Sequence, residues 1–93
     1  KASAPAYFDS LTGHRYIKND QSYREYSKKG EYLRTVNSDH PLLLNSRNIH
    51  PVLDDNYILY EKWCDGQKSY LSLPGSQQHP KGWKACKLMS VLD

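Results

Sequence analysis

The sequence predicts an all-β or β-dominated α+β fold, a small antiparallel meander or barrel of about six strands. Turn-forming residues recur at about the 8–12-residue spacing that is typical of small all-β domains. Tyrosine, threonine and valine, which favour strands, dominate residues 22–36. The connections between the expected hairpins are short, which favours antiparallel neighbours over parallel crossover units. We expect a flexible tail at residues 1–5 and one domain over residues 6–93.

The first hairpin is expected at the start of this domain. The strand that begins at Tyr7 turns at residues 9–13, where Asp and Ser side chains can hydrogen-bond the neighbouring backbone. Gly13 can take the positive φ that such a turn requires. Residues 14–18 then return as a strand, and residues 19–21 turn the chain again.

Residues 22–27 and 31–36 form a second hairpin in this interpretation, closed by Gly30 in the left-handed conformation. A helix that runs from Tyr23 to Leu33 is the alternative. Strands are preferred, because strand-forming residues dominate and a glycine interrupts the helical pattern.

Residues 37–56 are less regular. Two His-Pro dipeptides disfavour a long regular element in this segment. We expect at most a short strand at residues 42–44 and a turn of helix at residues 45–49.

The clearest local signal is Asp65-Gly66, which stands between two apolar runs and favours a two-residue β-hairpin loop. A loop at these residues pairs Trp63 with Lys68 and Tyr60 with Leu71. Alternate side chains then point to opposite faces of the hairpin. The predicted core face holds Ile58, Tyr60, Cys64, Leu71 and Leu73, and the predicted exposed face holds Glu61, Trp63, Lys68 and Tyr70.

A loop over residues 74–82 and a last strand over residues 83–92 complete the expected fold. The two cysteines, Cys64 and Cys86, would pair in an exported protein and would be ordinary buried thiols in a cytosolic one. A disulfide between them would add about 3 kcal/mol of stability in the chain-entropy model. The small size and the missing initial Met favour the disulfide and a secreted or periplasmic location.

The composition is that of a folded chain with a mild positive charge. Hydrophobic residues make up 38% and aromatic residues 12% of the sequence, which is too much for a disordered tail. Tyrosine is the main aromatic residue, and its amphipathic ring suits recognition surfaces. The net charge of +3 slightly favours anionic partners. The sequence lacks the runs of basic residues that are typical of a nucleic-acid-binding tail. No apolar run is long enough for a membrane span.

Motifs for metal or cofactor chemistry are missing from the sequence. The histidines and cysteines have no ligand spacing, and three of the four histidines precede proline, which places them in extended loops. A serine nucleophile elbow and a glycine-rich phosphate loop are also absent. We therefore expect no metal site, no cofactor and no catalytic residue.

One catalytic alternative stays open, a small secreted ribonuclease-like phosphodiester hydrolase. Such an enzyme needs a base for the 2′-hydroxyl proton, an acid for the leaving oxygen and a cation for the phosphate. The residues that could supply these groups are His14, Arg15, Glu25, Arg34 and His40.

The preferred hypothesis is a non-enzymatic binding or accessory module of an exported protein. An exposed hairpin face with aromatic and cationic groups can stack on sugars, bases or a partner peptide, although a Trp–Lys pair across the hairpin could equally be a stabilising contact. We expect a protein or glycan partner, with weaker support for nucleic acid, and a purely structural envelope domain is a third possibility. The predicted binding residues are Trp63, Lys68 and Tyr70 on this hairpin face, and Gln78 and His79 in the polar loop over residues 75–79.

Overall fold

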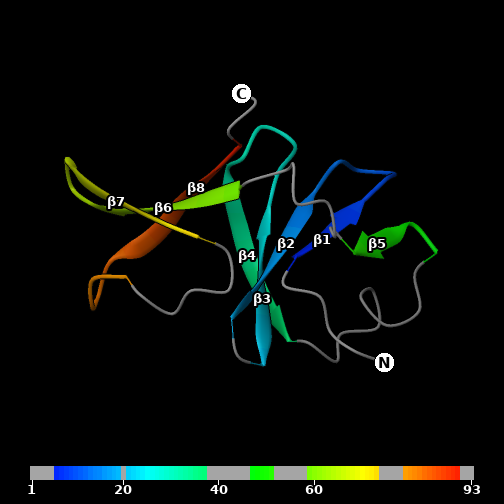
Figure 1. Cartoon of the computed structure of the whole chain (residues 1–93), viewed down its shortest axis with the longest axis horizontal. Coiled ribbons are helices and arrows are strands. Elements are labelled where there is room, and N and C mark those ends of the chain that lie inside the picture. Colours follow the sequence, from blue (N-terminus) through cyan, green and yellow to red (C-terminus); the bar gives the residue numbers. More distant parts are fainter. Residues whose placement is uncertain (1–5, 20, 38–46, 52–58, 74–78, 91–93) are drawn as a thin grey trace.

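The computed structural model has eight strands and no helix within the described part of the chain, so the all-β prediction is confirmed (Figure 1). The described residues are 6–19, 21–37, 47–51, 59–73 and 79–90. The tail predicted at residues 1–5 and the strand predicted at residues 42–44 lie outside these ranges. None of the described residues belongs to a helix that is long and apolar enough to cross a membrane.

Five strands form the larger sheet, in the order β4-β3-β2-β1-β5. They are β1 (Ala6–Asp9), β2 (Arg15–Asn19), β3 (Ser22–Tyr26), β4 (Tyr32–Asn37) and β5 (Ile49–Pro51). Strands β1 to β4 follow one another as the predicted antiparallel meander. Ile49 is in a strand rather than in the predicted turn of helix, because it pairs with Asp9 of β1.

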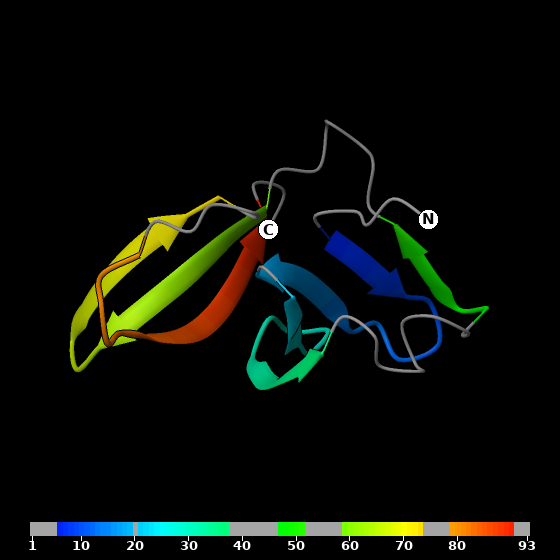
Figure 2. The same cartoon turned by 90° about the horizontal axis from the view of Figure 1, so that it is seen from below.

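Three strands form the smaller sheet, in the order β7-β6-β8. They are β6 (Leu59–Asp65), β7 (Lys68–Ser72) and β8 (Lys84–Ser90). The predicted disulfide between Cys64 and Cys86 is present and joins β6 to β8, with a Cα–Cα distance of 6.0 Å. Figure 2 shows this sheet as a layer at one end of the molecule, with β1 and β5 at the other end.

The first two hairpins close with the predicted turns. Asp9 Oδ1 accepts a hydrogen bond of 2.9 Å from the backbone N–H of Leu11, as expected for an Asp-initiated turn. Gly30 has a φ of 90°, and its carbonyl oxygen accepts a bond of 2.7 Å from Leu88 N–H of β8. A side chain at residue 30 would collide with the Leu88 carbonyl oxygen, so the junction of the two sheets requires glycine here.

Tyrosines supply much of the core, on both faces of the larger sheet. One cluster lies against β8, and a second cluster lies on the opposite face. Tyr16 and Tyr26 are almost fully buried, and each hydroxyl group donates to a buried carboxylate. The first cluster holds Ala6, Ile17, Tyr26 and Leu88, and the second holds Tyr16, Tyr23 and Val36.

The β6–β7 hairpin forms where the sequence predicted it, but its loop is displaced by one residue. Asp65 pairs with Lys68, so the two-residue loop is Gly66-Gln67 rather than Asp65-Gly66. Gly66 has a φ of 62°, which suits the first central position of a primed hairpin turn. Trp63 therefore faces Tyr70 rather than Lys68.

The predicted division of side chains between the two faces survives this shift, because each partner moves by two residues. The assignment of the faces to core and solvent is wrong. Trp63 and Glu61 are 5% and 0% exposed, whereas Leu71 and Leu73 are 51% and 53% exposed. Glu61 and Trp63 of the supposed exposed face are therefore buried, whereas Lys68 and Tyr70 on the same face are exposed as predicted.

The other residues of the predicted core face are not fully buried either, as far as the structure describes them. Tyr60 and Cys64 are only partly buried, and Ile58 lies outside the described residues. Glu61 can be buried because Arg24 of β3 neutralises it from the other sheet. The hairpin sequence alone does not contain that partner.

Candidate functional site

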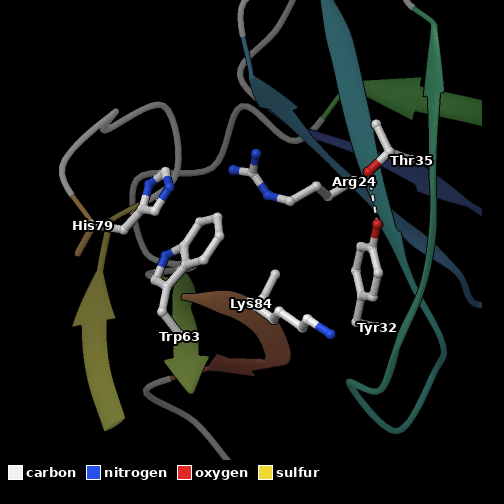
Figure 3. Close-up of a pocket in the computed structure, with 7 residues that line it drawn as sticks. Arg24, Tyr32, Thr35, Trp63, His79 and Lys84 are labelled. Carbon is white, nitrogen blue, oxygen red and sulfur yellow. Dashed lines mark hydrogen bonds between the residues drawn. The ribbon is translucent and has the colours of Figure 1, made fainter. Parts of the chain in front are cut away.

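A cleft of about 410 Å³ opens between the two sheets (Figure 3). Strands β4 and β8 each end their sheet, and they meet through the Leu88–Gly30 backbone bond and the neighbouring pairing of Glu31 with Lys87. Beyond this junction the two strands diverge (Figure 1). The described lining residues are Arg24, Tyr32, Thr35, Trp63, His79, Lys84 and Ala85.

Each of the diverging strands carries an extra residue close to the junction. Leu33 of β4 falls between two register pairs with β3, and Cys86 of β8 falls between two register pairs with β6. Such a bulge bends a strand and increases its local twist. We attribute the opening of the cleft to these two bulges.

One wall of the cleft is a stack of two aromatic rings. The rings of Trp63 and His79 are 3.8 Å apart between centroids, with an angle of 6° between their planes. Trp63 Nε1 donates a hydrogen bond of 2.8 Å to the hydroxyl group of Ser72, which fixes the indole in its plane. Because Trp63 is almost fully buried, it supports the His79 ring rather than presenting its own face to solvent.

Arg24 contacts the same indole and is held by a buried carboxylate. Its Cζ atom is 4.9 Å from the centroid of the Trp63 ring, within the range of a cation–π contact. Arg24 Nε and Nη2 donate to the two oxygens of Glu61 at 2.6 and 2.7 Å, and the Tyr26 hydroxyl donates to Glu61 Oε2 at 2.7 Å. This bidentate geometry fixes the guanidinium plane beside the cleft.

The surroundings of Arg24 keep its guanidinium charged. Burial alone would lower the pKa of Arg24, but the hydrogen bonds and the charge of Glu61 outweigh burial and raise it. Burial and the Glu61 charge also raise the pKa of the Tyr26 hydroxyl, so it remains a donor. Arg24 therefore stays charged where it bridges the two sheets to Glu61.

The other wall and the rim are more open. Tyr32 of β4 is 37% exposed, and its hydroxyl group lies 2.7 Å from Thr35 Oγ1. Lys84 at the start of β8 is exposed. His79 Nδ1 is buried and has no hydrogen-bond partner in the described part of the chain, an arrangement that is uncommon for a polar atom in a protein.

Two of the predicted binding residues, Trp63 and His79, meet in this cleft. Tyr70 is 40% exposed and lies across from Trp63 on the same face, and Lys68 is exposed near the hairpin turn, but neither is among the described lining residues. Gln78 lies outside the described residues.

Sequence reasoning missed the contribution of β3, β4 and β8 to this site. Arg24 lies 37 residues before Glu61, so no local pattern links the two. One signal was present, because Arg24 and Glu25 are consecutive charged residues in a segment predicted to be a strand. In such a segment each would need a partner on its own face of the sheet.

A second polar cluster surrounds Glu25 on the opposite face of the larger sheet. Tyr16, Glu25 and Arg34 stand side by side on β2, β3 and β4. Arg34 Nε donates to Glu25 Oε1 at 2.8 Å, while His14 Nδ1 and the Tyr16 hydroxyl lie 2.7 and 3.2 Å from Oε2. Three of the five residues named for the hydrolase alternative are thus brought together.

The cluster is a charged group with one side open to solvent. Burial alone would raise the pKa of Glu25, but the hydrogen bonds from Arg34 and His14 and the Arg34 charge outweigh burial and lower it. The side chains of His14 and Arg34 are 30% and 58% exposed. Arg15 does not take part, because it donates to the Lys28 carbonyl oxygen, and His40 lies outside the described residues.

No family model, curated protein or solved structure matches this chain. Within the described ranges, no group of three or more His, Cys, Asp and Glu side chains could hold a metal ion. Conclusions about function therefore depend on the chemistry of the cleft and of the Glu25 cluster.

Proposed function

We propose that this chain is a small non-enzymatic binding module and that it contacts its partner through the cleft between β4 and β8. The observation that carries this proposal is the Trp63–His79 stack, which is held at 3.8 Å beside the fixed guanidinium of Arg24. Aromatic walls with a few oriented polar groups are typical of ligand sites, and the volume of the cleft is in their usual range.

Two of the remaining predicted contacts, Tyr70 and Lys68, belong to the edge of this cleft in the proposal, and Gln78 lies outside the described residues. Tyr70 is on the same face as Trp63, Lys68 lies two residues before it on β7, and Gln78 precedes His79 in the chain. A protein or glycan partner would contact this periphery as well as the cleft. The Cys64–Cys86 disulfide supports placing the module in an exported protein.

A fragment titration followed by NMR tests the proposal. With the full chain labelled with ¹⁵N, small aromatic, sugar and peptide fragments should shift the backbone signals of Thr35, Lys84 and Ala85 and the Trp63 indole signal. A His79→Ala variant should weaken this binding about tenfold, because the displayed ring is lost, whereas the matched Leu71→Ala change on the opposite face should have no effect. Signal shifts that cluster around Leu71, or fragment binding that is as tight in His79→Ala as in the parent chain, would contradict the proposal.

A second candidate function is cleavage of RNA at the Glu25 cluster. In this hypothesis His14, oriented by Glu25, takes the 2′-hydroxyl proton, and the 2′-oxygen bonds to phosphorus as the bond to the 5′-oxygen breaks. Arg34 would hold the phosphate oxygens, and an acid would have to protonate the leaving 5′-oxygen. His14 and Glu25 are hydrogen-bonded to each other, so together they could act as one general base. A separate general acid is still required. The binding function is therefore the preferred proposal.

An RNA-cleavage assay separates the two functions. A binding module leaves a labelled oligoribonucleotide intact when the protein is in excess, with a metal chelator present to silence contaminating nucleases. Cleavage to 2′,3′-cyclic phosphate ends that disappears in His14→Gln, but persists in the matched Arg15→Gln variant, would replace the binding proposal with the hydrolase.

A further inference from the structure

We propose that the cleft accepts an anionic group carried on a flat ring, such as an aromatic carboxylate or an aryl phosphate. This inference rests on the proposed binding function and names the class of ligand. It follows from the charges that line the cleft, from the shape of its walls and from the unpartnered nitrogen of His79.

The charge of the lining is positive. The lining residues that the structure describes include Arg24 and Lys84 and no acidic residue. The nearby carboxylate of Glu61 is fully buried and already accepts three hydrogen bonds. A ligand anion in the cleft would therefore meet cations without an opposing free carboxylate.

Arg24 also keeps a donor for the ligand. Glu61 accepts from Nε and Nη2, so among the described residues this carboxylate leaves Nη1 as the guanidinium nitrogen that it does not use. Figure 3 shows the guanidinium group reaching toward the space beside Trp63, with Lys84 on the opposite side of the indole. Since Arg24 is held by its carboxylate, binding an anion through Nη1 would cost little additional side-chain entropy.

The walls favour a flat ring between them. Tyr32 with Thr35 forms one side, and the Trp63 indole forms the other, with the His79 ring stacked on the indole away from Tyr32 (Figure 3). Aromatic rings pack against flat partners at low entropy cost, because they have few rotatable bonds. Stacking of a sugar or of successive bases on Trp63 is disfavoured, because only 5% of this residue is exposed.

His79 provides an independent indication of a ligand. Its Nδ1 atom is buried and has no hydrogen-bond partner among the described residues, which is unfavourable for a polar atom. A turn of the His79 ring that brings Nδ1 to the cleft would allow a ligand oxygen or hydroxyl group to supply the missing hydrogen bond. The same residue thus offers both a ring face and a polar atom.

Four small probes separate the requirements for charge and for a ring. Benzoate and phenyl phosphate carry both features, benzamide lacks the charge, and cyclohexanecarboxylate lacks the flat ring. We expect the two aromatic anions to shift the Trp63 indole signal and to bind at least tenfold more tightly than the other two probes. The tighter of the two anions distinguishes a carboxylate ligand from a phosphate ligand, and either result supports the proposal.

A charge variant completes the experiment. Lys84→Gln should weaken the aromatic anions about fivefold, as expected for loss of one partly exposed charge, and should leave benzamide unchanged. The matched Lys29→Gln variant removes an exposed lysine of the turn between β3 and β4 that is not among the described lining residues, so it should have no effect. Benzamide or cyclohexanecarboxylate binding as tightly as benzoate would overturn the anionic-ring assignment while leaving the binding function standing. No shift at the cleft with any probe would overturn both.

Discussion

Two buried glutamates of this protein have similar partners but different surroundings. Glu61 and Glu25 are 0% and 4% exposed, and each accepts hydrogen bonds from an arginine and a tyrosine. Arg24, which pairs with Glu61, comes from the other sheet, and its side chain is 6% exposed. Arg34, which pairs with Glu25, comes from a neighbouring strand, and its side chain is 58% exposed.

This difference suggests a division of roles between the two clusters. The Arg24–Glu61 pair crosses the interface between the sheets and positions a guanidinium beside the cleft, so structure and ligand contact depend on the same bonds. The Glu25 cluster lies within one sheet, and solvent reaches its cation directly. We therefore expect the first cluster to dominate stability and the second to dominate the response to acid.

The largest effect is expected from breaking the pair between the sheets. Glu61→Gln should lower the free energy of unfolding by about 3–5 kcal/mol, because Arg24 is left as a buried charge without a counter-ion. Urea denaturation measures this loss. The double variant Arg24→Met, Glu61→Met should recover much of the loss, because no charge then remains buried. A double variant that is less stable than either single variant would contradict the assignment.

The backbone junction is the next tie between the sheets. Gly30→Ala should cost about 2–4 kcal/mol, because the residue has a positive φ and its new side chain would collide with the Leu88 carbonyl oxygen. The matched control is Gly66→Ala, at a positive φ but with open space around the new methyl group, where strain alone should cost about 1–2 kcal/mol. Equal losses in thermal denaturation would show that the junction contributes nothing beyond backbone strain.

The smallest effect is the acid response of the Glu25 cluster. The folded state lowers the pKa of Glu25, so the unfolded chain takes up the proton first as the pH falls. The stability that this glutamate contributes is therefore present above its ordinary titration range and is lost as the pH falls through that range toward the lowered folded value. Denaturation midpoints measured across this pH window should slope less steeply in Glu25→Gln than in the parent chain. An unchanged slope would show that Glu25 is not the titrating group.

Local signals in the sequence predicted the strands and the turns. The Asp9 turn, the left-handed Gly30 and the Asp-Gly hairpin all depend on residues within a few positions of one another, and each is found. The alternation around the hairpin also sorted its side chains correctly into two sets. Such patterns are readable because turn chemistry and strand periodicity act over short stretches of chain.

The burial of the hairpin could not be predicted in the same way. Apolar Leu71 and Leu73 favoured one face as the core, yet the buried face is the one with Glu61 and Trp63. That choice depends on Arg24, which reaches Glu61 from a different sheet and from far away in the sequence. Trp63 was named as a binding residue for its predicted exposure and His79 for its place in a polar loop, and the structure joins the two by stacking, with Trp63 buried.

The most direct test of this account is the proximity of the Trp63 and His79 rings in solution. Nuclear Overhauser effects between the indole protons of Trp63 and the ring protons of His79 should be strong, and the His79 protons should be shifted upfield by the stacked indole. Observation of both signals would show that the two rings are stacked in solution. The proposed cleft and its anionic ligand both require this stack. Random-coil shifts for the His79 ring, without cross-peaks to Trp63, would contradict the account.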